Sequence, residues 1–247
     1  MSLRYFRNLI DMFFQCEYIL PLIYVLMMAC IPFTFILNDA MIPYQTVTID
    51  GQYKLIKDFR YDNLLLEETN TTSLLAVINS FGTFVIFAVT WFGAYTEIYK
   101  WKNAIDKLVA YGVAYVLQDF VVSFGKQYIG AFRPNFYAGC GWDNDLGICT
   151  IDFDKGRRSF PSGHSSSATA VFVYLILSMN EIRAVLRSQN NVPVVIDKLL
   201  FAVTLLSGFV FLYVGFTRIH DFWNHPEDVI AGFLIGGMSA CVCRYML

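Results

Sequence analysis

Residues that suit phosphate chemistry gather in three short motifs along the chain. The first pairs a lysine with an arginine, the second joins serine, glycine and histidine, and the third joins arginine, histidine and aspartate. These residues are Lys126, Arg133, Ser162, Gly163, His164, Arg218, His225 and Asp228. Arginine can bond two phosphate oxygens at once, and the open N–H groups at the start of a helix attract an anion. The three motifs therefore predict a site for a phosphate group.

The residues of the first two motifs, together with Arg218, have expected roles in binding. Lys126, Arg133 and Arg218 supply positive charge, although each cation alone would also suit an anchor at a membrane surface. Ser162 offers its hydroxyl and its backbone N–H to a phosphate oxygen. Gly163 has no side chain, so the backbone there can approach a ligand closely. We therefore expect these five residues to bind the phosphate.

The two histidines and the aspartate are candidates for proton transfer and nucleophilic attack. Histidine titrates near neutral pH, so His164 suits protonation of a leaving alkoxide. His225 and Asp228 are three positions apart, which places them on one face of a helix that begins there. The carboxylate could then orient the histidine as nucleophile or base, or it could simply cap a helix whose first turn holds Pro226.

A zinc site is the competing interpretation of the same region. His164, His220 and His225 could bind the metal together with Asp228. The surrounding lysine and arginine residues would repel a cation, so we predict no metal and no cofactor. The chain also has no basic patch of the kind that binds nucleic acid.

The composition predicts an all-α integral membrane protein. Of the 247 residues, 56% are hydrophobic and only 15% are charged, whereas a soluble domain has about a quarter charged residues. Apolar runs near the length that crosses a bilayer are expected at 18–37, 74–95, 105–124, 165–179, 199–216 and 229–243. We therefore expect one membrane domain over 1–247, built as a bundle of six transmembrane helices.

Six spans place both termini on one side of the membrane and all three motifs on the other. This topology, independent of the motifs themselves, supports a single assembled site. Lysine and arginine are slightly more frequent on the side of the termini once the three site cations are set aside. That excess favours cytoplasmic termini and a luminal or extracytoplasmic site. We expect the membrane to be an endomembrane or the plasma membrane, although the sequence does not identify the organelle.

Two features of the loops on the motif side bear on its environment. Cys140 and Cys149 could form a disulfide if this side is oxidising, or they could be two free thiols. The sequence Asn70-Thr71-Thr72 is a glycosylation sequon, but it lies so close to the second span that we expect it to be unused.

The motifs together resemble those of the type 2 phosphatidic acid phosphatase family, also called lipid phosphate phosphatases. The family pattern is Lys-x6-Arg-Pro, then Pro-Ser-Gly-His, then Ser-Arg-x5-His-x3-Asp. The first two parts match at Lys126-x6-Arg133-Pro134 and Pro161-Ser162-Gly163-His164. The resemblance covers about residues 75–247. It implies a phosphatase-like core whose fold is shared with vanadium haloperoxidases, and metal-independent hydrolysis of phosphatidate-like phosphomonoesters.

The third motif departs from the family pattern at one position. Counted from Arg218, the nucleophilic histidine of the family should be residue 224, but this chain has Asn224 and its histidine is His225. One residue along a helix is a rotation of about 100° and a rise of about 1.5 Å. His225 therefore cannot replace the family nucleophile unless the helix start is shifted. Inactive relatives also have Asn-His here, but they have usually lost the first-motif cations.

Two main hypotheses follow from these residues. In the first, the protein is an active lipid phosphatase whose phosphate is held by the cations, attacked with the help of His225 and Asp228, and released as His164 protonates the alkoxide. In the second, the protein is an inactive relative that binds lipid phosphate or serves as a subunit of a membrane complex. Its partners would be membrane lipids in either case, with a homo-oligomer as a further possibility.

A transporter is a third and weaker interpretation. It rests only on Asp106 and Asp119 within the third span, because carboxylates inside a membrane can relay ions. We expect these carboxylates instead to pair with Lys107 or to cap the helix near Lys126.

Overall fold

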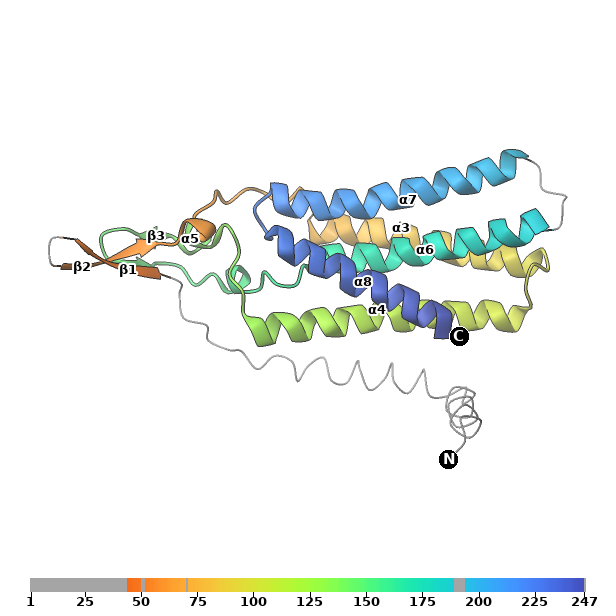
Figure 1. Ribbon diagram of the computed structural model, residues 1–247, viewed down its shortest axis with the longest axis horizontal. Helices are drawn as coiled ribbons and strands as arrows, with labels where there is room; N and C mark the ends of the chain where they lie inside the picture. The colour runs from red at the N-terminus through yellow and green to blue at the C-terminus, as the bar shows by residue number, and fades with distance from the viewer. Residues whose placement is uncertain (1–43, 50–51, 70, 189–193, 247) are drawn as a thin grey trace, which may run out of the picture.

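Five long helices dominate the computed structural model, which describes residues 44–49, 52–69, 71–188 and 194–246. All five are long and apolar enough to cross a membrane, and they run alongside one another (Figure 1). The helices are α3 (Thr72–Tyr95), α4 (Trp101–Ile129), α6 (Gly163–Ser188), α7 (Val194–His220) and α8 (Pro226–Met246). The chain is therefore a multi-pass, all-α integral membrane protein, as its composition predicted.

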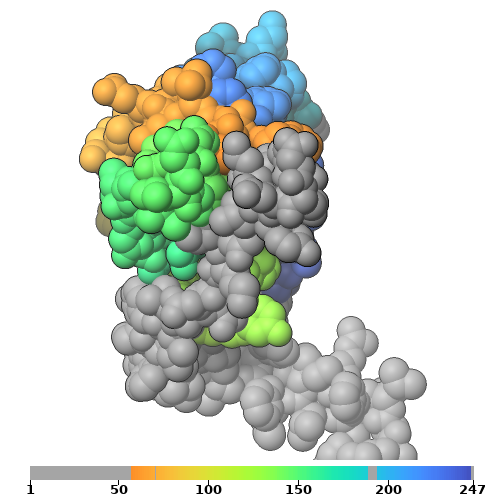
Figure 2. Space-filling view, turned by 90° about the vertical axis from the view of Figure 1, so that its left-hand side faces the viewer, coloured from red at the N-terminus to blue at the C-terminus, as the bar shows by residue number. Residues whose placement is uncertain are grey.

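Short elements collect at one end of the bundle (Figure 1). They are the antiparallel strands β1 (Tyr44–Ile49) and β2 (Gln52–Lys57), the turn η2 (Phe59–Tyr61), helix α5 (Phe136–Cys140), the antiparallel strands β3 (Trp142–Asp143) and β4 (Ile148–Cys149), and the turn η3 (Asp154–Arg157). Figure 2 views this end, where the segment before α3 and the residues between α4 and α6 both reach the surface.

Each of the five described helices extends beyond the apolar run that predicted it. The run at 165–179, for example, became the 26-residue helix α6, and the run at 105–124 became the 29-residue helix α4. Hydropathy identifies only the apolar part of a helix that lies within the bilayer, whereas the helical backbone continues into the polar residues at its ends. The expected span at 18–37, Cys16, Cys30 and the sequon residue Asn70 lie outside the described residues.

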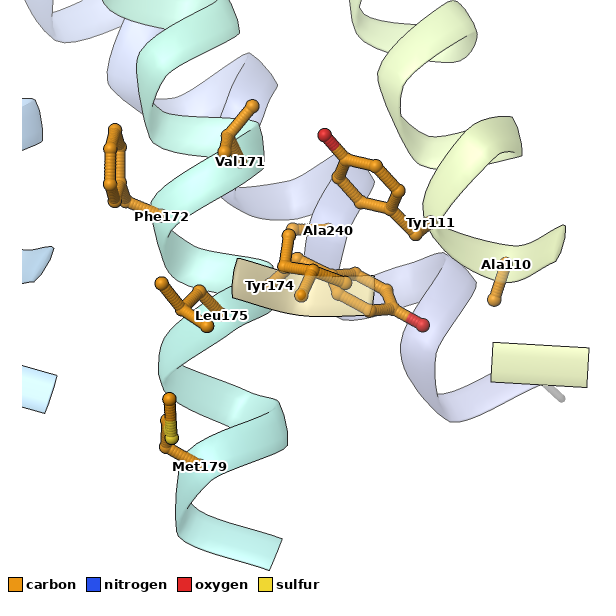
Figure 3. Close-up of a cluster of buried hydrophobic side chains, with 9 residues drawn as sticks. Ala110, Tyr111, Val171, Phe172, Tyr174, Leu175, Met179 and Ala240 are labelled. Carbon is orange, nitrogen blue, oxygen red and sulfur yellow. The ribbon is translucent and has the colours of Figure 1, made fainter. Parts of the chain in front are cut away.

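Helix α6 is the centre of the bundle and contacts α3, α4, α7 and α8. Half of its membrane-length segment is buried, against 17% for α3 and α7. Figure 3 shows the largest core cluster, in which α6 packs against Tyr111 of α4 and Ala240 of α8. The α6 residues of this cluster are Val171, Phe172, Tyr174, Leu175 and Met179. The second motif therefore leads into the most buried of the five helices.

Two glycines of α8 allow its backbone to approach the start of α6. A Cβ atom at Gly232 would lie 2.6 Å from the carbonyl oxygen of Ser162, and one at Gly236 would lie 2.2 Å from that of Ser166. Both distances are shorter than any real carbon–oxygen contact of this kind. These two glycines therefore serve close packing of α8 against α6 within the bundle.

The opposite end of the bundle carries a cluster of charged residues. Lys107 of α4 forms an ion pair with Glu181 of α6 at 2.5 Å, and Arg244 of α8 contacts the same carboxylate. The expected pairing of Lys107 with Asp106 is therefore wrong. Neighbours along a helix point in directions about 100° apart, and the helix packing brings Glu181 to Lys107 instead.

Candidate phosphate-binding site

The end of α4 explains why Lys126 and Arg133 are separated by six residues. The helix stops at Gly130, which has the left-handed φ of 60° and donates its N–H to the carbonyl oxygen of Lys126. The chain then turns back, and the N–H of Arg133 donates to the carbonyl oxygen of Gly156 at 2.8 Å. Lys126 thus lies on the last helical turn, while Arg133 reaches the same region from the loop.

Trp223 brings two of the expected cations together. The guanidinium of Arg133 lies 4.8 Å from the Trp223 ring centre, and that of Arg218 lies 5.6 Å from the same ring. Arg133 also donates from Nη1 to the carbonyl oxygen of Trp223 at 3.1 Å. Burial, followed by the charge of Arg218, lowers the pKa of Arg133 to about 10, although Glu68 and Asp228 oppose this shift.

Lys126 completes the cationic group beside the start of α6. Its charge is within electrostatic reach of Arg133, Arg158 and Arg218. Its Nζ lies 3.6 Å from the point where a Cβ atom would stand at Gly163. The N–H of Gly163 makes no hydrogen bond to any residue that the structure describes. A cation and an open helix N-terminus therefore face the same space, as an anion site requires.

Ser162 and Asn224 form a buried hydrogen-bond network at the base of this space. The Ser162 hydroxyl donates to Asn224 Oδ1 at 3.3 Å, and the same oxygen accepts from Arg218 Nε at 3.3 Å. Asn224 Nδ2 donates to the carbonyl oxygen of Ser159 at 2.7 Å. The backbone N–H of Ser162, which we expected to be open to phosphate, donates instead to the carbonyl oxygen of Asp228. The hydroxyl of Ser162 is joined to Arg218 through Asn224 Oδ1, and it also accepts from the Ser165 hydroxyl at 2.9 Å.

His164 lies next to a carboxylate that the sequence did not indicate. Its Nε2 is 3.9 Å from Oε2 of Glu68, and the same oxygen is 3.3 Å from Nη1 of Arg218. Arg218 is almost fully buried, with 1% of its side chain exposed. The structure therefore brings His164, Arg218 and Glu68 together on one side of the site.

His225 and Asp228 meet through the backbone and not through the imidazole. The Asp228 carboxylate accepts from the backbone N–H of His225 at 2.8 Å and from the Ser159 hydroxyl at 2.5 Å. Because α8 begins at Pro226, this is the reciprocal bond of a helix capping box, with proline in the first turn. Asp228 thus fixes the start of α8 rather than orienting the His225 ring.

The His225 ring lies on the side of the site formed by η2. It meets the Tyr61 ring edge to face, with 5.8 Å between ring centres. Its Nε2 is buried and makes no hydrogen bond within the described part of the chain. Asn224, by contrast, contacts Arg218 and Ser162 directly. The position that a family nucleophile would take is therefore filled by an amide, with His225 beside it.

The three histidines do not gather around a common point. His220 is 81% exposed and contacts Asp221, while His164 lies near Glu68. Over residues 44–49, 52–69, 71–188 and 194–246, no group of three or more histidine, cysteine, aspartate and glutamate side chains could hold a metal ion. The expectation of a site without a metal remains a prediction.

Sequence reasoning missed three residues of the site. Glu68 precedes α3, Arg158 lies in the loop before α6, and Trp223 lies between α7 and α8. Arg158 is in the same sequence stretch as Ser162, so its charge was a usable signal. Glu68 and Trp223 carried no such signal, because their roles depend on contacts with distant segments.

Comparison with known proteins identifies the family of this chain. The family model of the PAP2 superfamily matches residues 107–247, which include all three motifs and helices α6, α7 and α8. The chain belongs to the PAP2 superfamily. The resemblance found from the motifs is therefore confirmed, and so is the membrane architecture that it implied.

Curated relatives have names that refer to lipid phosphates. Lipid phosphate phosphatase 1 of Arabidopsis thaliana is 31% identical over 169 residues, which are 64% of this chain and 49% of that protein. Phospholipid phosphatase 2 of Homo sapiens is 24% identical over 236 residues, which are 88% of this chain and 78% of that protein. The chain thus spans about half the length of the plant relative. No solved structure matches the chain.

One further relative has a different kind of name. Phospholipid phosphatase-related protein type 4 of Homo sapiens is 34% identical over 84 residues, which are 34% of this chain and 10% of that protein. This PAP2 chain is therefore similar both to proteins named as phosphatases and to one named as related to them.

Proposed function

We propose that this PAP2 protein hydrolyses phosphomonoesters of membrane lipids without a metal ion. The observation that carries the proposal is the group of cations, Lys126, Arg133 and Arg218, which converges on the open start of α6. Arg218 is buried and forms an ion pair with Glu68, while Lys126 and Arg133 are half-buried. Like charges held this close together and partly out of water are costly unless further negative charge binds there. A phosphomonoester with close to two negative charges meets that requirement, and relatives named lipid phosphate phosphatase and phospholipid phosphatase support a phosphatase.

The location of the site favours a lipid substrate. The cations lie where α4 and α7 end and α6 begins, beside the loops that Figure 2 shows. A lipid phosphate group at the surface of a bilayer reaches this level while its acyl chains stay among the helices. Phosphatidate, lysophosphatidate, diacylglycerol pyrophosphate and isoprenoid or sphingoid phosphates all fit this description, because apolar helices accept many chains.

The proposed reaction transfers the phosphoryl group to water. Lys126, Arg133, Arg218, the Ser162 hydroxyl and the Gly163 N–H hold the phosphate oxygens. A water attacks phosphorus, the bond to the lipid oxygen breaks, and His164 gives a proton to that oxygen. His225 accepts the proton of the attacking water, since its Nε2 is not used in any hydrogen bond among the described residues. Asp228 keeps Asn224 and His225 at the start of α8.

We also propose that the site faces an extracytoplasmic or luminal compartment. A disulfide joins Cys140 and Cys149 at the end of the molecule that carries the site. Disulfides persist in oxidising compartments, so this bond favours a luminal or extracytoplasmic site. The excess of lysine and arginine expected on the side of the termini favours the same orientation. Thiol labelling in intact, sealed vesicles, before and after an impermeant reductant, tests this orientation.

Phosphate release tests the proposed activity directly. The purified full chain in detergent micelles is given phosphatidate in the presence of EDTA. We expect release by the native protein and a loss of roughly a hundredfold or more in Lys126→Met and Arg218→Ala, because each removes a charge that stabilises the transition state. Arg187→Ala is the control, since Arg187 pairs with Asp197 at the far end of the bundle.

The same assay, together with titration calorimetry of inorganic phosphate, distinguishes hydrolysis from binding alone. If the native protein binds phosphate but releases none from any of the proposed lipids, it is an inactive relative with an intact anion site. If EDTA abolishes release and a divalent metal restores it, the metal-independent reaction is wrong.

A further inference from the structure

Glu68 is an internal anion at the proposed phosphate site. Its Oε2 lies 3.3 Å from Nη1 of the buried Arg218 and 3.9 Å from Nε2 of His164. A carboxylate and a phosphate present similar anionic oxygens to an arginine fork. The Glu68 side chain is largely covered, with 22% exposed. The carboxylate therefore stands where a phosphate oxygen would bind Arg218.

Hydrogen bonds on both sides of Glu68 hold its segment against the end of the bundle. Thr69 donates to Asp221 twice, from its N–H at 2.6 Å and from its hydroxyl at 2.8 Å. On the other side of Glu68, the carbonyl oxygen of Leu66 accepts from Trp223 Nε1 at 3.0 Å. Trp223 is the residue that packs against Arg218. Both attachments therefore lie beside the arginine that Glu68 contacts.

A second set of contacts holds the earlier part of the same segment. The N–H of Asn63 donates to the carbonyl oxygen of Pro134 at 3.0 Å, and Asn63 Nδ2 contacts the same oxygen. Tyr61 packs against Phe132 and His225. A carboxylate attached to so constrained a segment has a high effective concentration at Arg218, as a tethered ligand does.

We propose that Glu68 determines the phosphate affinity of this site by occupying the Arg218 and His164 side of it until phosphate takes its place. This inference rests on the proposed function, because it assumes that the cations bind phosphate. Two anions within about 4 Å repel each other, so Glu68 has to leave Arg218 when a phosphate binds. Its return after hydrolysis favours release of inorganic phosphate. Glu68 is thus an affinity-determining residue outside the three motifs.

Glu68→Gln tests this exchange, because it removes the charge while keeping the size of the side chain. Titration calorimetry of the full chain in micelles measures the dissociation constant of inorganic phosphate. We expect roughly tenfold tighter binding in Glu68→Gln, in line with the loss of one charge-assisted contact. Glu67→Gln is the matched control, since Glu67 is exposed and its loss removes the same charge from the adjacent position. We expect it to bind as the native protein does.

A second variant keeps the charge and loosens its attachment. Thr69→Val removes the hydroxyl that donates to Asp221 but is similar in shape, so it tests the exchange even if Glu68→Gln does not fold. We expect binding that is tighter by about two- to threefold, because the tether is weakened and not removed. In turnover assays both variants should lower KM for the lipid substrate.

The outcomes separate the two proposals. If the native protein and Glu68→Gln bind phosphate equally, the exchange is wrong while the anion site stands. If Glu68→Gln lowers kcat with no change in affinity, Glu68 is a catalytic group and the exchange is again wrong. If neither protein binds phosphate, the proposed site itself fails, and the inference fails with it.

Discussion

The side-chain amide of Asn224 donates a hydrogen bond to the backbone carbonyl oxygen of Ser159 over 2.7 Å. This bond joins the turn before α8 to the loop before α6, two segments that are 65 residues apart in the sequence. The Asn224 carbonyl meanwhile accepts from Ser162 and Arg218. The side chain of Asn224 therefore links the loop before α6, Arg218 and the turn before α8, at the position where the family resemblance places a nucleophilic histidine.

Asn224→His should create a covalent intermediate that the native protein cannot form. An imidazole at this position would lie beside Arg218 and Ser162, whereas an amide cannot accept a phosphoryl group. We expect a phosphohistidine to be trapped from radiolabelled substrate in the variant only. Loss of the bond to Ser159 should cost about 1 kcal/mol of stability. Asn224→Gln controls for the change in size, and a phosphohistidine in the native protein would contradict the prediction.

Gly163→Ala should weaken phosphate binding without harming the fold. The added methyl group would lie 3.6 Å from Nζ of Lys126 and 3.5 Å from Val122 Cγ1, which are ordinary contacts. It would nevertheless occupy space between the ammonium and the start of α6. We expect phosphate to bind roughly tenfold more weakly by titration calorimetry. Gly112→Ala is the control, because nothing lies within 4 Å of its added methyl. Equal binding in both variants would show that phosphate does not use this space.

Gly236→Ala should destabilise the bundle, while its neighbour tolerates the same change. A Cβ at Gly236 would lie 2.2 Å from the Ser166 carbonyl oxygen and 3.0 Å from the Ala170 nitrogen, and both are backbone atoms that cannot turn away. We expect a loss of about 1–3 kcal/mol, seen as a lower unfolding temperature in micelles. At Gly237 the nearest atom is Thr169 Cγ2 at 3.8 Å, so Gly237→Ala should be neutral or slightly stabilising. If Gly236→Ala lowers the unfolding temperature no more than Gly237→Ala does, α6 and α8 can move apart to make room for the methyl group.

Acid should release the segment that carries Glu68. Burial tends to raise the pKa of Asp221, but hydrogen bonds from His220 and Thr69 outweigh it and hold the pKa below the ordinary value of 3.8. The stabilisation from this carboxylate is therefore complete above pH 3.8 and is lost as the pH falls through the lower folded value. Hydrogen exchange of the Thr69 amide, corrected for its intrinsic pH dependence, should speed up in that range.

The variant Asp221→Asn provides the comparison for the acid effect. It cannot become charged, so its Thr69 amide should exchange faster than in the native protein at neutral pH and show no further change in acid. A native Thr69 amide that stays equally protected through this range would mean that Asp221 does not fasten the segment.

The sequence by itself determined the five described helices and the end of the bundle at which the motifs meet. Hydropathy is a local property, and the runs at 74–95 and 199–216 were enough to predict α3 and α7. The spacing between Lys126 and Arg133 also carries local information, since Gly130 ends the helix between them. Counting spans then placed the motifs together, because each span reverses the side of the membrane on which the chain emerges.

Only the tertiary structure decided which role each residue of the site has. The sequence offered Asp228 both as a partner for the His225 ring and as a cap, and the start of α8 at Pro226 makes it a cap. The cysteines likewise allowed a disulfide or two thiols, and the pairing of β3 with β4 brings Cys140 and Cys149 into a disulfide. Such choices depend on where backbone segments stop and turn, which residue types alone do not fix.

Glu68 shows most clearly what sequence could not reveal. Nothing in the residues around it indicates a binding role, and its neighbour Thr69 is fastened to Asp221 across 152 positions of the chain. Contacts of this kind form only when helices that are distant in sequence pack side by side and bring their ends together. The motifs therefore determined which chemistry the chain could carry, and the packing determined which carboxylate faces Arg218.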